Sequence, residues 1–496
     1  MEKYDVIIIG AGLGGLLSTN ILSREGYNVC VIEKNPQLGG CLQVFGRDKC
    51  VFNTGLNYTE ALGEGQILNR YFKYFGIMDE LPVKQLDKDC FEMVTFKDRE
   101  YKFAQGHENF IETLSVQFPA EKDNLKRYIA QLGSVCNQFP LYNIDAPLNF
   151  NTNVFEGKSA YEYLSSVTPN HDLQQVLAGT NLLYAGVKNK TPMYIHALIN
   201  YSFITSAWRI PGGSHQLVQL LAKSIINNGG TILRGKQVEK LVLEKSEIKY
   251  VQLADGDRLE ARYVISNMHP HRTLTMLEGD FSRKAYYKRI LSLKNTTGMF
   301  TLYIVLKENT FKYINYNHYY YVTNTVWTAE MQNNPSWPLS YMLYTPSSAK
   351  EQEYAKNIIA MTYMSIDELK QWENTSVGNR GERYETFKME KAEQLLDLIE
   401  KKFPAIRACI KSYYTSTPLT YRDYTGTPGG SAYGVSKDYQ HPIASIVLPK
   451  TKIPNLFFTG QNLNLHGILG VTIGAVMTCG EIVGLNYLME KIKKGS

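Results

Sequence analysis

Three glycines near the N-terminus have the spacing of a phosphate-binding turn. Gly10, Gly12 and Gly15 directly follow a short β-branched run at residues 5–9, and residues 16–22 then place apolar side chains at helical spacing. The first glycine permits a tight turn, the second lets backbone approach a pyrophosphate, and the third lets helix and strand pack closely. The N–H groups and dipole of a helix start attract the phosphates. The turn, which includes Leu13 and Gly14, therefore predicts a dinucleotide-binding site.

An acidic residue stands where such a turn requires one. Glu33 ends a second buried run at residues 29–32, about 20 residues beyond the turn. Its carboxylate can accept both ribose hydroxyls of the adenosine and would repel a 2′-phosphate, so NADP is disfavoured at this site. We place Glu33 and the adjacent Lys34 in the predicted cofactor site.

A second glycine pair favours FAD over NAD. Gly39 and Gly40 follow Glu33 within seven residues. This pair lets the backbone pass beside an extended ribityl-pyrophosphate, which NAD does not have. A second strand–GxGxxG–helix unit is not visible, so we expect the substrate to meet the isoalloxazine ring directly.

Both ends of the chain resemble one flavoprotein family. Residues 10–15, Glu33, 39–40 and 52–55 resemble the flavin-binding core of amine oxidases and carotenoid desaturases. Residues 416–420, 429–434, 456–462 and 467–475 resemble the retinol saturase and carotenoid isomerase branch of that superfamily. This chain has Cys41 and Asn53 where the family usually has arginine and aspartate.

The resemblance implies further FAD contacts at a strand backbone, at the ribityl-phosphate region and at a helix start. The residues concerned are Val238, then Gly460 and Gln461, and finally Gly470, Val471 and Thr472. At the last of these, backbone N–H groups would face the flavin pyrimidine edge, where the reduced ring carries negative charge.

The elements that position these residues lie in three separated stretches. The length of 496 residues predicts two or three domains. An α/β rhythm occupies residues 1–65, 206–284 and 441–496, whereas residues 66–205 and 285–440 are rich in aromatic side chains. We predict an α/β fold, in which a Rossmann-like FAD-binding domain in three pieces carries an inserted α+β substrate domain built from the two aromatic stretches.

The aromatic stretches bear on the substrate. The chain has 35 tyrosines, many of them in the insertions. A long apolar ligand needs an aromatic-lined tunnel, but tyrosine is also common in half-buried strands, and both interpretations remain open.

Reaction at a carbon–carbon double bond needs a proton donor or acceptor near the flavin. His466, just before the flavin-contacting helix, and Tyr433, in a glycine-bounded turn, are the candidates. The alternative for His466 is a loop histidine bonded to backbone. His269 and His271 have no third ligand nearby, so we expect no metal site.

We therefore predict a FAD-dependent oxidoreductase that acts on a double bond of a lipophilic polyene or lipid, in the manner that the resemblance to retinol 13,14-reductases implies. The alternatives are a carotenoid desaturase or isomerase, a flavin amine oxidase and, outside enzymes, a lipid-binding escort protein. The sequence does not identify the electron donor or acceptor.

Composition bears on the partners and the compartment. The net charge of +6 is spread thinly, so we expect no nucleic-acid partner. Seven cysteines without a CxxC pair, and no cleavable signal, predict a cytoplasmic protein. The lipophilic substrate adds the expectation of peripheral membrane contact.

Overall fold

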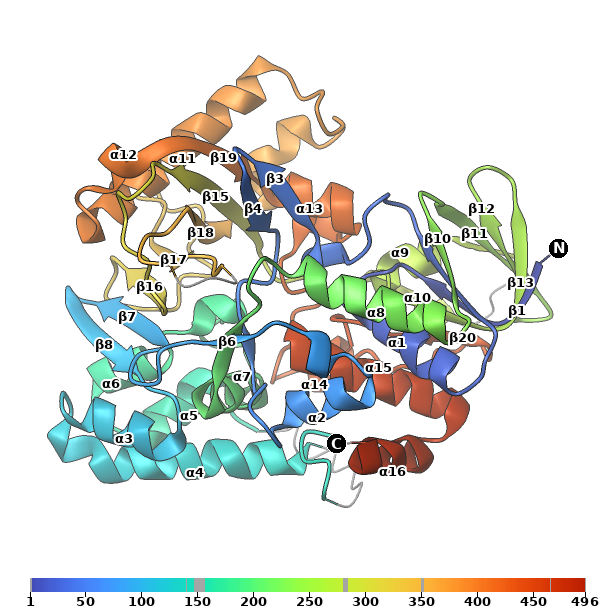
Figure 1. The fold of residues 1–496 in the computed structure, drawn as a ribbon, viewed down its shortest axis with the longest axis horizontal. Helices are drawn as coiled ribbons and strands as arrows, with labels where there is room; N and C mark the ends of the chain where they lie inside the picture. Colours follow the sequence, from blue (N-terminus) through green and yellow to red (C-terminus); the bar gives the residue numbers. More distant parts are fainter. Residues whose placement is uncertain are drawn as a thin grey trace.

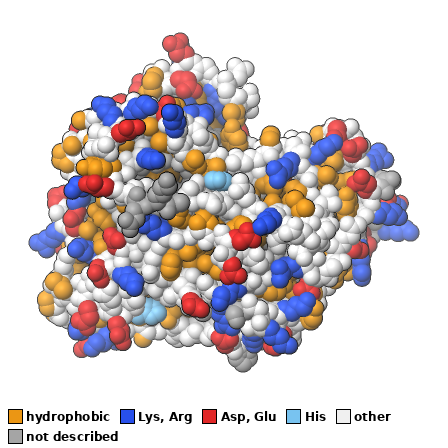
Figure 2. Space-filling view, viewed as in Figure 1, with side chains coloured by type: hydrophobic (Ala, Val, Ile, Leu, Met, Phe, Trp, Pro, Cys, Tyr) orange, Lys and Arg blue, Asp and Glu red, His pale blue; other side chains and the backbone are white. Residues whose placement is uncertain are grey.

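The computed structural model describes residues 2–139, 141–146, 157–279, 284–348, 352–463 and 465–495. Two large sheets organise it (Figure 1). On the surface, Lys and Arg side chains are interspersed with Asp and Glu side chains over the face shown in Figure 2.

The first sheet draws its strands from three distant parts of the chain. Its parallel core has the order β10-β2-β1-β13 with β20 beside β13, and β12, β11 and β14 extend it. The bounds are β1 Glu2–Ile9, β2 Val29–Glu33, β10 Thr231–Arg234, β11 Val238–Glu244, β12 Glu247–Leu253, β13 Arg258–Ser266, β14 Leu277–Glu278 and β20 Leu456–Phe458. The predicted α/β class is confirmed, and the five domain boundaries remain a prediction.

Buried helices cover this sheet. Helix α1 (Leu13–Arg24) packs between α15 (Gly467–Val483) and α8 (His215–Asn227). Polar side chains join these helices, because the Asn20 amide of α1 donates to Ser224 Oγ of α8 at 2.8 Å. A short helix, α16 (Leu485–Gly495), follows α15 after Gly484, whose φ of +102° turns the chain. No helix in the described ranges is long and apolar enough to cross a bilayer.

The second sheet is buried on both faces. Its order is β19-β15-β18-β17-β16-β7-β8. Successive side chains of β15 alternate between two cores, with Phe300 on one face and Met299 on the other. The bounds are β7 Glu92–Phe96, β8 Arg99–Phe103, β15 Gly298–Leu306, β16 Asn317–Tyr321, β17 Ser340–Tyr344, β18 Asn357–Met364 and β19 Ile410–Ser416.

Helices cover the second sheet on each side. The core on one face includes residues of α3 (His107–Ser115), α4 (Lys122–Gln138), α5 (Ala160–Val167), α6 (His171–Leu177) and α7 (Met193–Thr205). The core on the other face includes residues of α11 (Glu382–Lys402) and α12 (Ile406–Cys409). The two groups of helices lie on opposite sides of the sheet in Figure 1.

Short strands and helices connect the two large sheets. β3 (Val44–Arg47) pairs with β4 (Cys50–Asn53), and β9 (Ala207–Arg209) pairs with β5 (Thr59–Glu60) and β6 (Lys84–Gln85). Helices α2 (Ile67–Tyr74), α9 (Pro270–Thr275), α10 (Lys284–Leu291), α13 (Pro418–Thr425) and α14 (Pro442–Ser445) complete the regular helices, with short 3₁₀ turns between elements. This region places residues 57–60 between the sheets.

Buried neutral histidines predict a loss of stability in mild acid. His318, beside the Thr95 hydroxyl, is fully buried, and burial lowers its pKa to about 3. Below pH 6.5 this histidine is protonated in the unfolded chain but stays neutral in the folded chain. The free energy of unfolding therefore falls as the pH drops from 6.5. The slope is about 1.4 kcal/mol per pH unit for each such group. Urea unfolding at pH 6.5 and 5.0 is expected to show a shallower slope for His318→Gln than for His441→Gln, an exposed control. Equal pH slopes of the unfolding free energy for the two variants would contradict a neutral, buried His318.

Candidate functional site

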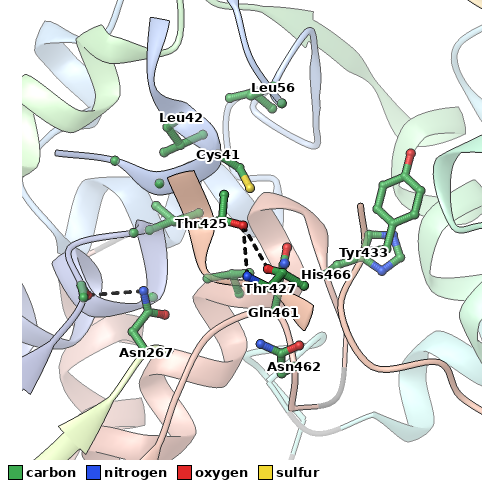
Figure 3. A pocket seen from close by; sticks show the side chains of 18 of the residues that line it. Cys41, Leu42, Leu56, Asn267, Thr425, Thr427, Tyr433, Gln461, Asn462 and His466 are labelled. Carbon is green, nitrogen blue, oxygen red and sulfur yellow. Dashed lines mark hydrogen bonds between the residues drawn. The ribbon is translucent and has the colours of Figure 1, made fainter. Parts of the chain in front are cut away.

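One continuous cavity of about 630 Å³ runs from the carboxyl edge of the first sheet to the second sheet. Glu33 at the end of β2 lines it, and so does Tyr344 at the end of β17. Figure 3 shows a close view, with Asn267 at one side and Tyr433 beside His466 at another. A cavity of this size, lined by residues from two sheets, is typical of a small-molecule site.

The glycine turn forms one end of the cavity. The first hydrogen bond of α1 runs from Leu16 N to Gly12 O, so the N–H groups of Leu13, Gly14 and Gly15 precede the helical ladder. Gly10, Gly12, Leu13 and Gly14 line the cavity, whereas Gly15 does not. A Cβ at Gly15 would overlap the carbonyl oxygen of Gly10. Gly15 therefore serves the close contact between helix and strand.

The second glycine pair lies against the first turn. Gly39 N donates to Ala11 O at 2.8 Å, and Gly39 (φ +112°) and Gly40 (φ +57°) both adopt the left-handed backbone region. A Cβ on Gly40 would come within 3.2 Å of Gly12 Cα. The backbone of both turns is thus exposed to the cavity without side chains.

Glu33 and Lys34 both line the cavity. One Glu33 carboxylate oxygen accepts from Ala11 N and the other from Asn35 N, each at 2.9 Å. These bonds hold the carboxylate at the edge of the sheet. Lys34 donates to the carbonyl of Asp423 at 2.7 Å, and burial lowers its pKa.

Only some of the FAD contacts predicted beyond residue 230 line the cavity. Val238, Gln461 and Val471 line the cavity, while Gly460, Gly470 and Thr472 lie behind its wall. Gly460 has φ +92°, and a Cβ there would overlap Asn267 Oδ1.

Helix α15 begins earlier than the resemblance implied. Its N-cap is His466 and its first residue is Gly467, so the N–H groups that precede the helical ladder are those of residues 467–469. Val471 and Thr472 therefore lie inside the helical ladder. One early N–H group, that of Leu469, donates to Glu60 Oε1 at 3.1 Å.

His466 and Tyr433 lie together on the cavity wall. Their rings are 4.5 Å apart between centroids. His466 Nε2 donates to Leu183 O and the Tyr433 hydroxyl donates to Leu182 O, both at 2.8 Å. Burial lowers the pKa of His466 to about 4, so it is neutral at physiological pH. Backbone carbonyls accept both hydrogens in this geometry, and the catalytic roles of the two residues stay predictions.

The far end of the cavity is apolar and aromatic. Its wall includes Tyr58, Leu198, Phe203, Met342, Tyr344 and Met361. The tyrosines of β16 do not line the cavity, because Tyr319 and Tyr321 pack beneath the helices and Tyr320 packs on the opposite core. The tyrosines of residues 285–440 therefore divide between the sheet and the cavity, which Tyr344, Tyr421, Tyr424 and Tyr433 line.

Several residues that line the cavity were not among those predicted from the sequence. Asn267 directly follows β13, and its amide donates to Gly10 O at 3.3 Å. A polar residue at the carboxyl end of a buried strand is the signal that could have found it. Tyr58, Glu60 and Arg272 carry no such local signal. Among the residues that the structure describes, no group of three or more His, Cys, Asp or Glu could hold a metal ion, and all seven cysteines are free.

Comparisons with known proteins agree with this geometry. Residues 8–75 match the NAD(P)-binding Rossmann-like domain family. Human all-trans-retinol 13,14-reductase is 26% identical over 99% of this chain and 87% of its own length. Chloroplastic prolycopene isomerase of Daucus carota is 22% identical over 99% of this chain and 81% of its own. The chain is a relative of the retinol saturases and carotenoid isomerases.

Solved structures share the fold of this relative of the saturases. A Methanosarcina mazei oxidoreductase aligns with a TM-score of 0.65 at 16% identity, over 95% of this chain and 98% of its own. Putrescine oxidase bound to putrescine aligns with a TM-score of 0.63 at 14% identity, over 97% and 99%. The protein is an oxidoreductase, and it shares its fold with putrescine oxidase.

Proposed function

We propose that this protein is a FAD-dependent oxidoreductase that reduces a carbon–carbon double bond in a lipophilic polyene or related lipid. The observation that carries the proposal is the single cavity, which continues from the glycine turns at Gly10 and Gly39 to the aromatic wall at Tyr344. The relatives named all-trans-retinol 13,14-reductase and prolycopene isomerase support a polyene substrate.

The residues at the first end fit FAD. Gly12 and Gly40 present backbone to the cavity, and neither position has room for a side chain, because a Cβ would press on Asn267 Nδ2 or on Gly12 Cα. Glu33 lines the same end, with a carboxylate for the ribose. Val238, Gln461 and the start of α15 extend this set of contacts along the cavity. When bound, FAD supplies a ring that accepts or donates hydride.

The chain itself binds and shields the substrate. Leu198, Phe203, Met342 and Met361 offer apolar surface for a long hydrocarbon and exclude water from the reacting end. Glu60 lies at this end too, and burial raises the pKa of its carboxyl. The division into a three-piece FAD-binding domain and an inserted substrate domain belongs to this proposal, as does a cytoplasmic protein with peripheral membrane contact.

Flavin spectroscopy tests the proposed function. The purified protein is expected to be yellow, with an absorbance maximum at about 450 nm. After anaerobic photoreduction, all-trans-retinol or a carotenoid is expected to restore this absorbance in a single turnover. Bleaching of the oxidised protein by a carotenoid precursor would indicate a desaturase instead, and bleaching by putrescine would indicate an amine oxidase. A colourless protein that does not bind added FAD would indicate a lipid-binding escort protein.

His466→Gln is expected to change the rate of polyene-dependent reoxidation by less than about tenfold. Its amide can still donate to the Leu183 carbonyl, and the neutral histidine that it replaces has no charge to lose. Stopped-flow absorbance between pH 5 and 8 is expected to give the wild-type pH profile. A loss beyond about 100-fold, the range of general acid catalysis, would assign the proton transfer to His466.

A further inference from the structure

A hydrogen-bonded group of buried side chains lies behind the apolar end of the cavity. Tyr58 lines the cavity, and its hydroxyl donates to Glu92 Oε1 and lies 2.7 Å from the Tyr319 hydroxyl. Glu92 is the first residue of β7 and is fully buried, while Tyr58 precedes β5 and is 6% exposed. The contact therefore links the second sheet to the cavity wall.

This surrounding keeps Glu92 uncharged. Burial raises the pKa of Glu92 to about 8, although hydrogen bonds from Tyr58 and Tyr319 favour the carboxylate. The second oxygen, Oε2, is buried without a hydrogen-bond partner. Burying a charged carboxylate oxygen in this way would cost much free energy, which favours the protonated form. The other titratable groups that interact with it electrostatically are Tyr321, Tyr344 and Cys90. Burial raises the pKa of all three, so they are neutral too.

Tyr58 lies near the helix start that faces the cofactor end of the cavity. Tyr58 and Glu60 are two residues apart, both line the cavity, and Glu60 accepts from Leu469 N of α15. The Tyr58 ring is held by Phe203, with 4.6 Å between centroids, and by Tyr344, with 5.8 Å. These contacts fix the ring in the cavity wall, and Glu92 and Tyr319 hold its hydroxyl.

We propose that Tyr58 is the catalytic acid that protonates the substrate double bond, and that Glu92 acts through it by returning a proton to its oxygen. This inference rests on the proposed function. One carbon of the double bond accepts hydride from the reduced flavin, and its neighbour accepts the Tyr58 hydroxyl proton. The substrate gains two hydrogens and the flavin is oxidised by two electrons. Glu92 reprotonates Tyr58 and recovers its own proton from solvent between turnovers.

Single-turnover reoxidation in the holoenzyme tests the acid. Tyr58→Phe is expected to slow polyene-dependent reoxidation by at least about 100-fold, while the affinity of the oxidised enzyme for the polyene changes less than about threefold. Tyr71→Phe is the matched control, because Tyr71 of α2 is also a buried tyrosine but does not line the cavity, and its hydroxyl donates to the backbone of Leu141. In D₂O the wild-type product is expected to carry one solvent deuterium. The wild-type rate is expected to fall as the pH rises through about 8, and Glu92→Gln to lose this alkaline limb.

Infrared difference spectroscopy tests the same group without turnover. The protonated Glu92 carboxyl is expected to give a C=O band at pH 7 that Glu92→Gln removes. Tyr58→Phe is expected to move the disappearance of this band to higher pH, because it removes a hydrogen bond that favours the carboxylate. Tyr71→Phe is expected to leave the titration unchanged.

The outcomes separate the two proposals. A wild-type enzyme that no polyene reoxidises would overturn the proposed function and the acid role with it. A wild-type enzyme that turns over, with Tyr58→Phe within threefold of it, would overturn the acid role alone. A Glu92 carboxyl already ionised at pH 7 would overturn the role of Glu92.

Discussion

Gly15→Ala is expected to yield a protein that no longer retains the FAD that we propose it binds. A Cβ at this position would overlap the carbonyl oxygen of Gly10, so α1 must move away from β1. Backbone on both sides of the contact leaves no flexible side chain to yield. We expect the affinity for FAD to fall at least about 100-fold, and the free energy of unfolding to fall by about 3 kcal/mol, the upper range for overpacking. Flavin content per protein and a fluorescence titration with FAD measure the effect.

Gly474→Ala is the matched control for this prediction. It is also a glycine in a buried helix, α15, but its nearest neighbour to an added Cβ is Gly460 O at 3.8 Å. Alanine favours the helix there by about 0.5–1 kcal/mol, so this variant is expected to keep its flavin. FAD binding by Gly15→Ala equal to that of the control would show that the turn is not the nucleotide site.

Arg209→Met is expected to lower the free energy of unfolding by about 3–5 kcal/mol, the cost of breaking a buried charged network. Arg209 on β9 is 1% exposed, and its guanidinium donates to Tyr316 O and Asn317 Oδ1 at 2.9 Å and to Thr345 O. Methionine fills much of the volume but leaves these oxygens without a donor. These hydrogen bonds join β9 to the ends of β16 and β17. The substitution removes them, and with them a contact that holds the aromatic wall of the cavity in place. Urea unfolding measures the loss.

Two further variants interpret the Arg209 result. Arg209→Lys is expected to fall between wild type and Arg209→Met, because an ammonium keeps the charge but not the planar fork. Arg383→Met removes an exposed arginine of α11 and is expected to stay within about 0.5 kcal/mol of wild type. Equal stability of Arg209→Met and Arg383→Met would refute the structural role of the buried guanidinium.

The nucleotide end of the site was predictable because its residues interact locally. Gly10, Gly15 and Glu33 lie in one strand–helix–strand unit, where chain geometry alone brings the turn and the carboxylate to the same sheet edge. The start of α15 was less predictable. At this start Glu60, a residue distant in sequence, accepts the N–H of Leu469. A single sequence shows no pattern for that contact.

The aromatic stretches show the same limit at the other end of the site. Alternation predicts strands over residues 300–306 and 319–323, and the structure has β15 at Gly298–Leu306 and β16 at Asn317–Tyr321, which ends two residues earlier than predicted. Periodicity does not say which tyrosine meets the cavity, because both faces of the second sheet are buried. Tyr344 lines the cavity and Tyr320 packs in a core, although both come from similar apolar runs.

The sequence by itself determined the α/β class, the glycine turn and the acidic residue beside it, since these depend on interactions within about 30 residues along the chain. Only the tertiary structure decided that Tyr58 touches Glu92, that Asn267 supports the turn, and that His466 gives its hydrogen to backbone. These contacts join distant segments, and their chemistry depends on burial, which is a property of the folded chain and not of any local run of residues.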